Sequence, residues 1–484
     1  MTRQVLQHID NDKIFLVNRS EIEGRLEPEF YRPSIASLEK HIRSLSSRRL
    51  KDYALSIAGG ATPKKTEADM FYSDSKSGIP FLRVQNLQTS GELSLDDCVH
   101  INKDTHDGML KRSQVAEGDL LVKITGVGRM AIASVAPKGF VGNTNQHMVV
   151  IKTGDADISK YLARYLNLDI VERIASRHST GGTRPALDYP SLKNIPVIEG
   201  IDFSIIDKAI ILKKQKEIEA QQLIDSIDSY ILEKLNIRLP DINKQTLQDR
   251  IFIVNRSLLE NRFDPYYSQE YFRSAFKALE SSKYPVVNLK EISKLITSGI
   301  TPKSGGDAYT EDKSRGVPFV RSGNISIDGE LNYYDLLYLK PEIHENVMGS
   351  SKLKRDDILI AIVGATIGQV GIYISEGEAN INQAIALIRL KEGYNVQFVK
   401  ELIKSSIGQL SLNRLKRPVA RANINLEEIS RIKVVLPPEE KQQEIVNHIM
   451  AIRQQAKALQ EEGKEILEQA KKEVESMIMY GKKN

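Results

Sequence analysis

Residues 14–20 read IFLVNRS and residues 251–257 read IFIVNRS, so one heptapeptide opens two stretches of the chain. Three further pairs follow in the same order: GIPFLR (78–83) with GVPFVR (316–321), EGDLLV (117–122) with RDDILI (355–360), and NTNQ (143–146) with NINQ (380–383). A repeat this long is too large for a solenoid unit. It indicates two whole domains that share one fold.

Each half alternates helical and extended patterns, which predicts an α+β fold. Apolar residues at helical spacing predict a helix at 34–49, and 271–279 repeats this pattern weakly. Short runs rich in Val, Ile and Leu, bounded by Gly or Asn, predict strands. These runs lie at 120–125, 148–152, 358–363 and 384–390.

The clearest helical signal follows each body. Residues 439–480 carry apolar side chains at three- and four-residue spacing, interrupted only at Gly463, and residues 203–235 follow the same rule. We therefore expect two pseudo-symmetric mixed α/β domains separated by long antiparallel coiled-coil helices.

These patterns predict six segments along the chain. They are an N-terminal arm with a short helix (1–50), a first globular domain (51–198), a central spacer helix and linker (199–249), a second arm with a short helix (250–285), a second globular domain (286–437) and a C-terminal spacer helix (438–484).

The composition is that of an ordinary globular protein of 484 residues, with 41% hydrophobic and 27% charged residues. A single cysteine excludes an intramolecular disulfide and a cysteine-rich zinc site, which favours a reducing cytoplasm. No apolar run approaches the roughly 18 residues of a membrane span, so we expect no membrane partner. A net charge of +5 is compatible with nucleic acid but also with many enzymes.

Searches for catalytic motifs find no GxxxxGK[ST] phosphate loop, HExxH, zinc-binding Cys pair or GxSxG elbow. The glycine-rich stretch VGATIG at 363–368 is interpreted as a plain turn between strands. The sequence therefore predicts no catalytic residue, no metal site and no cofactor in this chain.

The features that repeat are loops with amides, hydroxyls and guanidinium groups. Arg pairs with guanine, and Asn or Gln with adenine, while Lys and Ser suit phosphates. We predict DNA contacts in the first copy from Lys64, Lys65, Arg83, Asn86, Asn143, Asn145, Gln146, His147, Arg177, His178 and Arg184. The second copy supplies Lys303, Ser304, Arg321, Asn324, Asn380, Asn382, Gln383, Arg414, Lys416, Arg417 and Arg421.

Simpler roles stay open for these residues. The amides can cap turns through Asx hydrogen bonds, and the basic loops can be solvated surface charge. Arg83 and Arg321 stand in the same motif in both copies, although the copies should read different bases. That repetition suits a phosphate contact or a framework salt bridge.

Together these marks resemble the specificity (S) subunit of Type I restriction-modification enzymes. The resemblance rests on the two TPK turns, GxPFxRxxN, NxNQ and the stretch LPPEEKQ at 436–442 that enters the last helix. It implies two target-recognition domains that each read one half of a bipartite double-stranded DNA target. The first copy reads PVIEG at 196–200 instead of the second copy's PPxxxQ entry, so the two docking sites need not be equivalent.

The resemblance also implies the partners. The helices would dock two methyltransferase (M) subunits and recruit restriction (R) subunits, which would hold S-adenosylmethionine, ATP and Mg²⁺. This chain would be a non-catalytic subunit whose spacer helices set the gap between the two half-targets. The alternatives are a fused DNA-modifying enzyme and a protein-binding coiled-coil scaffold.

Overall fold

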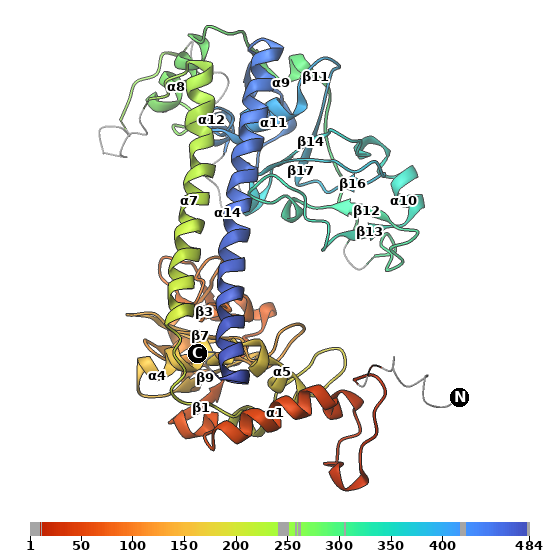
Figure 1. Cartoon of the computed structure of the whole chain (residues 1–484). Coiled ribbons are helices and arrows are strands. Elements are labelled where there is room, and N and C mark those ends of the chain that lie inside the picture. Colours follow the sequence, from red (N-terminus) through yellow and green to blue (C-terminus); the bar gives the residue numbers. More distant parts are fainter. Residues whose placement is uncertain are drawn as a thin grey trace. The chain divides into compact units, whose positions relative to one another are not determined.

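The computed structural model describes residues 10, 12–240, 251–256, 259, 263–303, 306–416 and 423–481. The chain forms two compact units (Figure 1). Unit 1 comprises Met1–Ile218 and Leu459–Asn484, and unit 2 comprises Glu219–Ala458. The two long helices each contribute residues to both units, whereas the sequence prediction set them apart as separate segments.

Unit 1 contains two sheets. The four-stranded antiparallel sheet has the order β1 (Ser56–Gly59), β9 (Met148–Lys152), β6 (Leu120–Lys123) and β7 (Ala133–Val135). The five-stranded sheet has the order β2 (Tyr72–Ser73), β4 (Val99–Ile101), β3 (Ile79–Leu82), β8 (Val141–Thr144) and β5 (Gln114–Ala116). Within it β3 and β8 are parallel.

Unit 2 repeats this topology. Its four-stranded sheet has the order β11 (Ser293–Ser298), β17 (Ile385–Leu390), β14 (Ile358–Ala361) and β15 (Val370–Ile372). A three-stranded sheet has the order β13 (Leu337–Leu339), β12 (Val317–Val320) and β16 (Asn380–Ile381), again with one parallel pair, β12 and β16. Strands β10 (Val286–Asn288) and β18 (Lys433–Val435) pair separately, where unit 1 has a single bridge between Arg49 and Pro196.

Short helices complete each unit. Unit 1 has α1 (Pro33–Leu45), α2 (Ala68–Phe71), α3 (Lys103–Asp107), α4 (Ala156–Leu166), α5 (Asp169–Arg177) and α6 (Tyr189–Lys193). Unit 2 has α8 (Glu270–Glu280), α9 (Leu289–Ile292), α10 (Pro341–Asn346), α11 (Val396–Lys404), α12 (Ser406–Leu415) and α13 (Leu426–Ser430). The start of α4 is fixed by Asp155, whose carboxylate accepts from the backbone N–H groups of Asp157 and Ile158 at 2.7 and 3.3 Å. Such a cap stabilises a helix by about 1 kcal/mol.

The long helices are α7 (Ser204–Leu235) and α14 (Glu439–Tyr480). In unit 2 the Tyr230 ring stacks on His448, and Lys234 pairs with Glu444 at 3.8 Å. Since the residue number rises along α7 as it falls along α14, the helices pair antiparallel there.

Unit 1 holds the other halves of these helices, which also run antiparallel. Lys216 pairs with Glu462 at 2.7 Å, and a Cβ on Gly463 would lie 3.3 Å from the Cα of Lys213. Gly463 therefore marks a close backbone approach and does not end α14. The predicted antiparallel pairing is confirmed within each unit.

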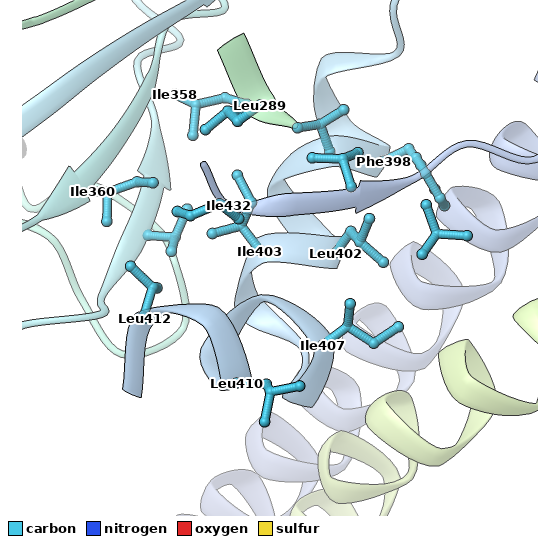
Figure 2. Close-up of a cluster of buried hydrophobic side chains, with 14 of the residues drawn as sticks. Leu289, Ile358, Ile360, Phe398, Leu402, Ile403, Ile407, Leu410, Leu412 and Ile432 are labelled. Atoms are coloured by element: carbon cyan, nitrogen blue, oxygen red, sulfur yellow. The ribbon is translucent and has the colours of Figure 1, made fainter. Parts of the chain in front are cut away.

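Each unit has its own apolar core. In unit 2 the core joins α11 and α12 to β14, and Figure 2 shows Leu402, Ile403 and Ile407 among these side chains. The seam of the long helices extends the core, because Ile227, Ile231 and Leu235 are buried in it. Burying each such side chain contributes about 1.5–3 kcal/mol. Packing therefore holds these half-helices to their unit.

The described part of the chain contains no helix long and apolar enough to cross a membrane.

Candidate nucleic-acid interface

Two of the predicted loops meet in unit 1. A Cβ on Gly60 would lie 2.0 Å from the carbonyl oxygen of Thr144, so only glycine allows the turn at 60–65 to approach the turn at 145–147 so closely. The Thr62 hydroxyl donates to Oε1 of Gln146 across this contact. The lysine turn and the amide turn therefore form one surface.

The third loop lies beside them. Thr180 and Ala186 form an antiparallel bridge that closes the loop. The backbone N–H of Leu187 donates to Ile124 O at 2.8 Å, and Ile124 N–H donates to His147 O at 2.9 Å. These two bonds connect the base of the loop at 180–186 to the amide turn.

The surface formed by Thr62, Lys64, Gln146, His147 and Arg184, here called the unit 1 polar edge, is polar and positive. Lys64, Gln146 and Arg184 are exposed. Partial burial, together with the charge of Arg184, lowers the pKa of His147. His147 is therefore a neutral imidazole at pH 7, and its Nδ1 has no hydrogen-bond partner among the described residues.

Unit 2 builds its edge in the same way. A Cβ on Gly299 would lie 1.7 Å from the carbonyl oxygen of Ile381, and the Gln383 N–H donates to Thr301 Oγ1 at 3.3 Å. Lys303 and Gln383 are exposed. We call Thr301, Lys303 and Gln383 the unit 2 polar edge. The predicted contacts Ser304, Arg417 and Arg421, and the side chain of Lys65, lie outside the described residues.

Both edges include a threonine that the sequence prediction omitted. Thr62 and Thr301 each precede the Pro-Lys pair of the repeated TPK turn and bind the amide turn. Their recurrence in both TPK motifs is the sequence signal that could have identified them.

Two predicted base-reading amides are instead interior residues. Asn143 and Asn380 are fully buried. Their Oδ1 atoms bind Nδ1 of His106 and of His344 respectively. The Asn143 amide also donates to Leu110 O at 2.9 Å. A DNA contact would break this buried network, so burial corrects the prediction for both residues.

The amides after the GxPFxR motif are also structural. Asn86 and Asn324 are buried. Their Oδ1 atoms accept from the backbone N–H of Arg83 at 2.8 Å and of Arg321 at 2.9 Å. The prediction that Asn86 and Asn324 contact DNA is corrected to a turn-closing role.

The two arginines of this motif hold the following loop. Arg83 donates from Nη2 to Asp97 O at 3.1 Å, and Arg321 donates to Asp335 O at 2.9 Å and to the Asp335 carboxylate at 3.1 Å. Of the two roles left open, phosphate contact and framework salt bridge, these contacts favour the framework role.

The remaining amides of the NxNQ motif lie at the turn itself. Asn145 is buried, and its Oδ1 accepts from the His147 N–H at 3.1 Å in an Asx turn, so the capping alternative holds for this residue. Asn382 has a buried Oδ1 without a partner among the described residues. It stays a predicted contact.

The basic pair at the C-terminal end of α5 in unit 1 faces inward. Arg177 donates from Nη1 to Glu39 at 2.5 Å, and His178 Nε2 lies 2.9 Å from the same carboxylate. Arg177 also donates from Nε to Phe30 O at 2.7 Å. The buried Glu39 therefore engages both side chains, which corrects their predicted DNA role.

The basic residues at the end of α12 in unit 2 are also engaged within the protein. Arg414 stacks on the Tyr267 ring at 3.8 Å and donates to Tyr267 O at 3.1 Å. Lys416 donates to Asn413 Oδ1 at 2.8 Å, and burial lowers its pKa. The structure assigns Arg414 and Lys416 to packing contacts.

Parts of the chain are similar to specificity subunits of Type I restriction enzymes. The family model for the Type I restriction modification DNA specificity domain matches residues 281–469. The specificity subunit of the Type I restriction enzyme EcoBI from Escherichia coli is 29% identical over 181 residues, which cover 36% of this chain and 37% of that protein. A putative specificity subunit of the Type I restriction enzyme MjaX from Methanocaldococcus jannaschii is 26% identical over 189 residues, which cover 37% and 42% of the two chains.

The matched segments thus span less than half the length of these relatives. A solved structure of the S subunit of a Type I restriction-modification system from M. genitalium has a TM-score of 0.35 and 14% identity, and covers 88% of this chain and 95% of that chain. Residues 281–469, less than half of the chain, are similar to the Type I restriction modification DNA specificity domain.

Proposed function

We propose that this chain is the DNA-reading, non-catalytic subunit of a Type I restriction-modification enzyme. The observation that carries the proposal is the polar edge repeated in two units of the same topology. Each edge offers a lysine beside a TPK turn and an exposed glutamine, Gln146 or Gln383. These groups suit phosphates and base edges respectively.

We further propose that each unit reads one half of a bipartite target. The buried positions Asn143 and Asn380 are identical, and so are the motif residues Arg83 and Arg321. The loop that begins after Thr180 in unit 1 differs in sequence from the matched segment of unit 2. A constant framework with variable loops supports two readers of different half-targets.

The partners follow from the same proposal. The long helices dock two methyltransferase subunits and recruit restriction subunits, and S-adenosylmethionine, ATP and Mg²⁺ act in those partners. The length of the spacer helices α7 and α14 sets the gap between the half-targets. Purified chain incubated with DNA and labelled S-adenosylmethionine should transfer no methyl group, and robust turnover would refute the non-catalytic role.

DNA reading is tested with the full-length chain in complex with its methyltransferase partner. The complex is mixed with a library of random DNA duplexes, and the duplexes that bind are sequenced. We expect a bipartite motif. Arg184→Ala should lower the affinity for one half-site by about 5- to 150-fold, the range for losing one base contact of about 1–3 kcal/mol. Gln383→Ala should weaken the other half-site.

The matched control is Lys160→Ala, which removes an exposed cation on α4, a helix that carries none of the three loops. It should leave both half-sites unchanged. Equal binding of all sequences by the unaltered complex would refute the proposal and favour the scaffold alternative.

A further inference from the structure

Three side chains with metal-ligand chemistry meet in unit 2, outside the polar edge. His344 and Glu345 are neighbours on α10, and Glu378 lies two residues before β16. His344 Nε2 is 3.0 Å from Glu378 Oε2 and 3.6 Å from Glu345 Oε1. The three ligand atoms all lie within 4.8 Å of one another.

The hydrogen bonds of Asn380 fix the state of the His344 ring. The Asn380 amide nitrogen donates to Met348 O at 2.9 Å and lies 3.3 Å from Ser351 Oγ, so its Oδ1 faces His344 Nδ1. An amide oxygen only accepts, hence Nδ1 carries the hydrogen. In the neutral ring, Nε2 then presents a lone pair to two carboxylates that also only accept.

That arrangement is the one found in metal-binding histidines. A ligating imidazole commonly donates its other N–H to an oxygen that orients the ring, as Asn380 does here. His344 is buried, so the ring cannot turn its Nε2 toward solvent. The Nε2 lone pair and the two carboxylates repel one another, and a cation bound between them would remove this repulsion.

The distances suit a small divalent ion. Zinc bonds to nitrogen and oxygen are about 2.0–2.2 Å, so neighbouring ligands of a tetrahedral site lie about 3.3 Å apart. The measured 3.0 and 3.6 Å bracket this value, and 3.6 Å is too long for a hydrogen bond. The other carboxylate oxygen of Glu345, Oε2, accepts a hydrogen bond from Lys352 Nζ at 2.5 Å.

Unit 1 has the same histidine without the complete ligand set. His106 binds Asn143 as His344 binds Asn380, but its Nε2 lies 3.9 Å from Asp107. Val141, two residues before Asn143, stands where unit 2 has Glu378. The shared histidine and asparagine are therefore framework, and the second carboxylate is particular to unit 2.

We propose that His344, Glu345 and Glu378 bind one divalent transition-metal ion, with Zn²⁺ the best fit, and leave a fourth position for water. The sequence predicted no metal site because these ligands lie on two segments without a standard spacing. The ion would connect α10 to the segment that leads into β16.

The test measures zinc content and Zn²⁺ titration of untagged full-length protein after treatment with a chelator. We expect the unaltered chain to bind one Zn²⁺ more than Glu378→Gln, with Mg²⁺ in excess failing to displace it. Glu378 is exposed, so the substitution spares the core. The affinity should fall by more than about tenfold, because losing even a group that only orients a ligand costs that much.

Glu376→Gln is the matched control, since it removes an exposed carboxylate of the same loop that pairs with Arg355 instead. It should bind zinc like the unaltered chain. Equal zinc binding by the unaltered chain and Glu378→Gln would overturn the proposal, and His344 would then be an imidazolium ion paired with both glutamates.

Discussion

The two units fasten their N-terminal arms by different chemistry at one equivalent position. In unit 1 the buried Glu39 of α1 contacts Arg177 and His178. In unit 2 that position is Phe276 of α8, and the Arg414 guanidinium lies 4.9 Å from the centre of its ring. One unit thus uses a carboxylate and the other an aromatic ring beneath the same arginine.

The shared part of the contact explains why both solutions work. Arg177 stacks on Phe30 at 4.3 Å and donates to its carbonyl oxygen, and Arg414 does the same with Tyr267 at 3.8 Å. The arginine on an aromatic residue of the arm is therefore the conserved framework within this chain. The second side chain beside the arginine, Glu39 in unit 1 and Phe276 in unit 2, determines whether the contact depends on charge.

Replacing Glu39 and Phe276 by leucine should distinguish the ionic contact of unit 1 from the aromatic contact of unit 2. Glu39→Leu leaves Arg177 and His178 without their buried carboxylate, and breaking such a pair costs about 3–5 kcal/mol. Phe276→Leu keeps an apolar side chain and should cost less than about 1.5 kcal/mol. Hydrogen exchange of the α1 and α8 amides measures each loss.

The exposed pair of Glu29 and Arg32 supplies the control for unit 1. Glu29→Gln should change the opening free energy measured by hydrogen exchange by less than about 1 kcal/mol. If Glu39→Leu cost no more than Phe276→Leu, the ionic description of the unit 1 contact would be wrong.

Low pH should weaken the Glu39 contact of unit 1 but not the Phe276 contact of unit 2. Burial by itself would raise the pKa of the Glu39 carboxyl, but the hydrogen bonds and charges of His178, Arg43 and Arg177 outweigh it and lower the pKa to about 2. Because the folded pKa lies below the ordinary 4.5, the stabilisation is complete above about pH 4.5 and is lost as pH falls through 2. Its size is about 3 kcal/mol.

The free energy of unfolding of the unaltered chain should therefore exceed that of Glu39→Gln at pH 7, and the difference should shrink as pH falls from about 4.5 to 2. Chemical denaturation at each pH gives this difference. A difference that stayed constant over this range would rule out the lowered pKa of Glu39.

A smaller effect is expected at the arginine of unit 2. Arg414→Lys keeps the charge but loses the planar group that stacks on Tyr267 and Phe276, which should cost about 0.5–1 kcal/mol. Hydrogen exchange of α8 measures it, with the exposed Arg315→Lys as the control. A loss above about 3 kcal/mol would show that charge pairing also dominates in unit 2.

The sequence predicted the elements of this fold well because their patterns are local. The spacing over 439–480 corresponds to α14, and the Val-rich run at 148–152 is β9. The stretch at 363–368 is the expected turn between β14 and β15. Repeated landmarks indicated two copies of one fold, which the matching strand orders confirm.

The roles of single side chains were harder to predict, because they depend on contacts between distant residues. Arg177 appeared to be a free basic residue, yet its partner Glu39 lies far away in the sequence on α1. Asn143 and Asn380 are the opposite case. Their identity in two copies that should read different targets was a sign of a framework role that the sequence prediction did not use, since recognition residues should differ.

The most direct test of the two-reader account exchanges residues 51–198 for the same segment of a relative with a different target. Mapping methylated bases in cells that carry the exchanged chain and the proposed methyltransferase partner reports both half-targets at once. We expect one half of the target to change to that of the relative while the other half stays unchanged. A change in both halves together would contradict the assignment of one half-target to each unit.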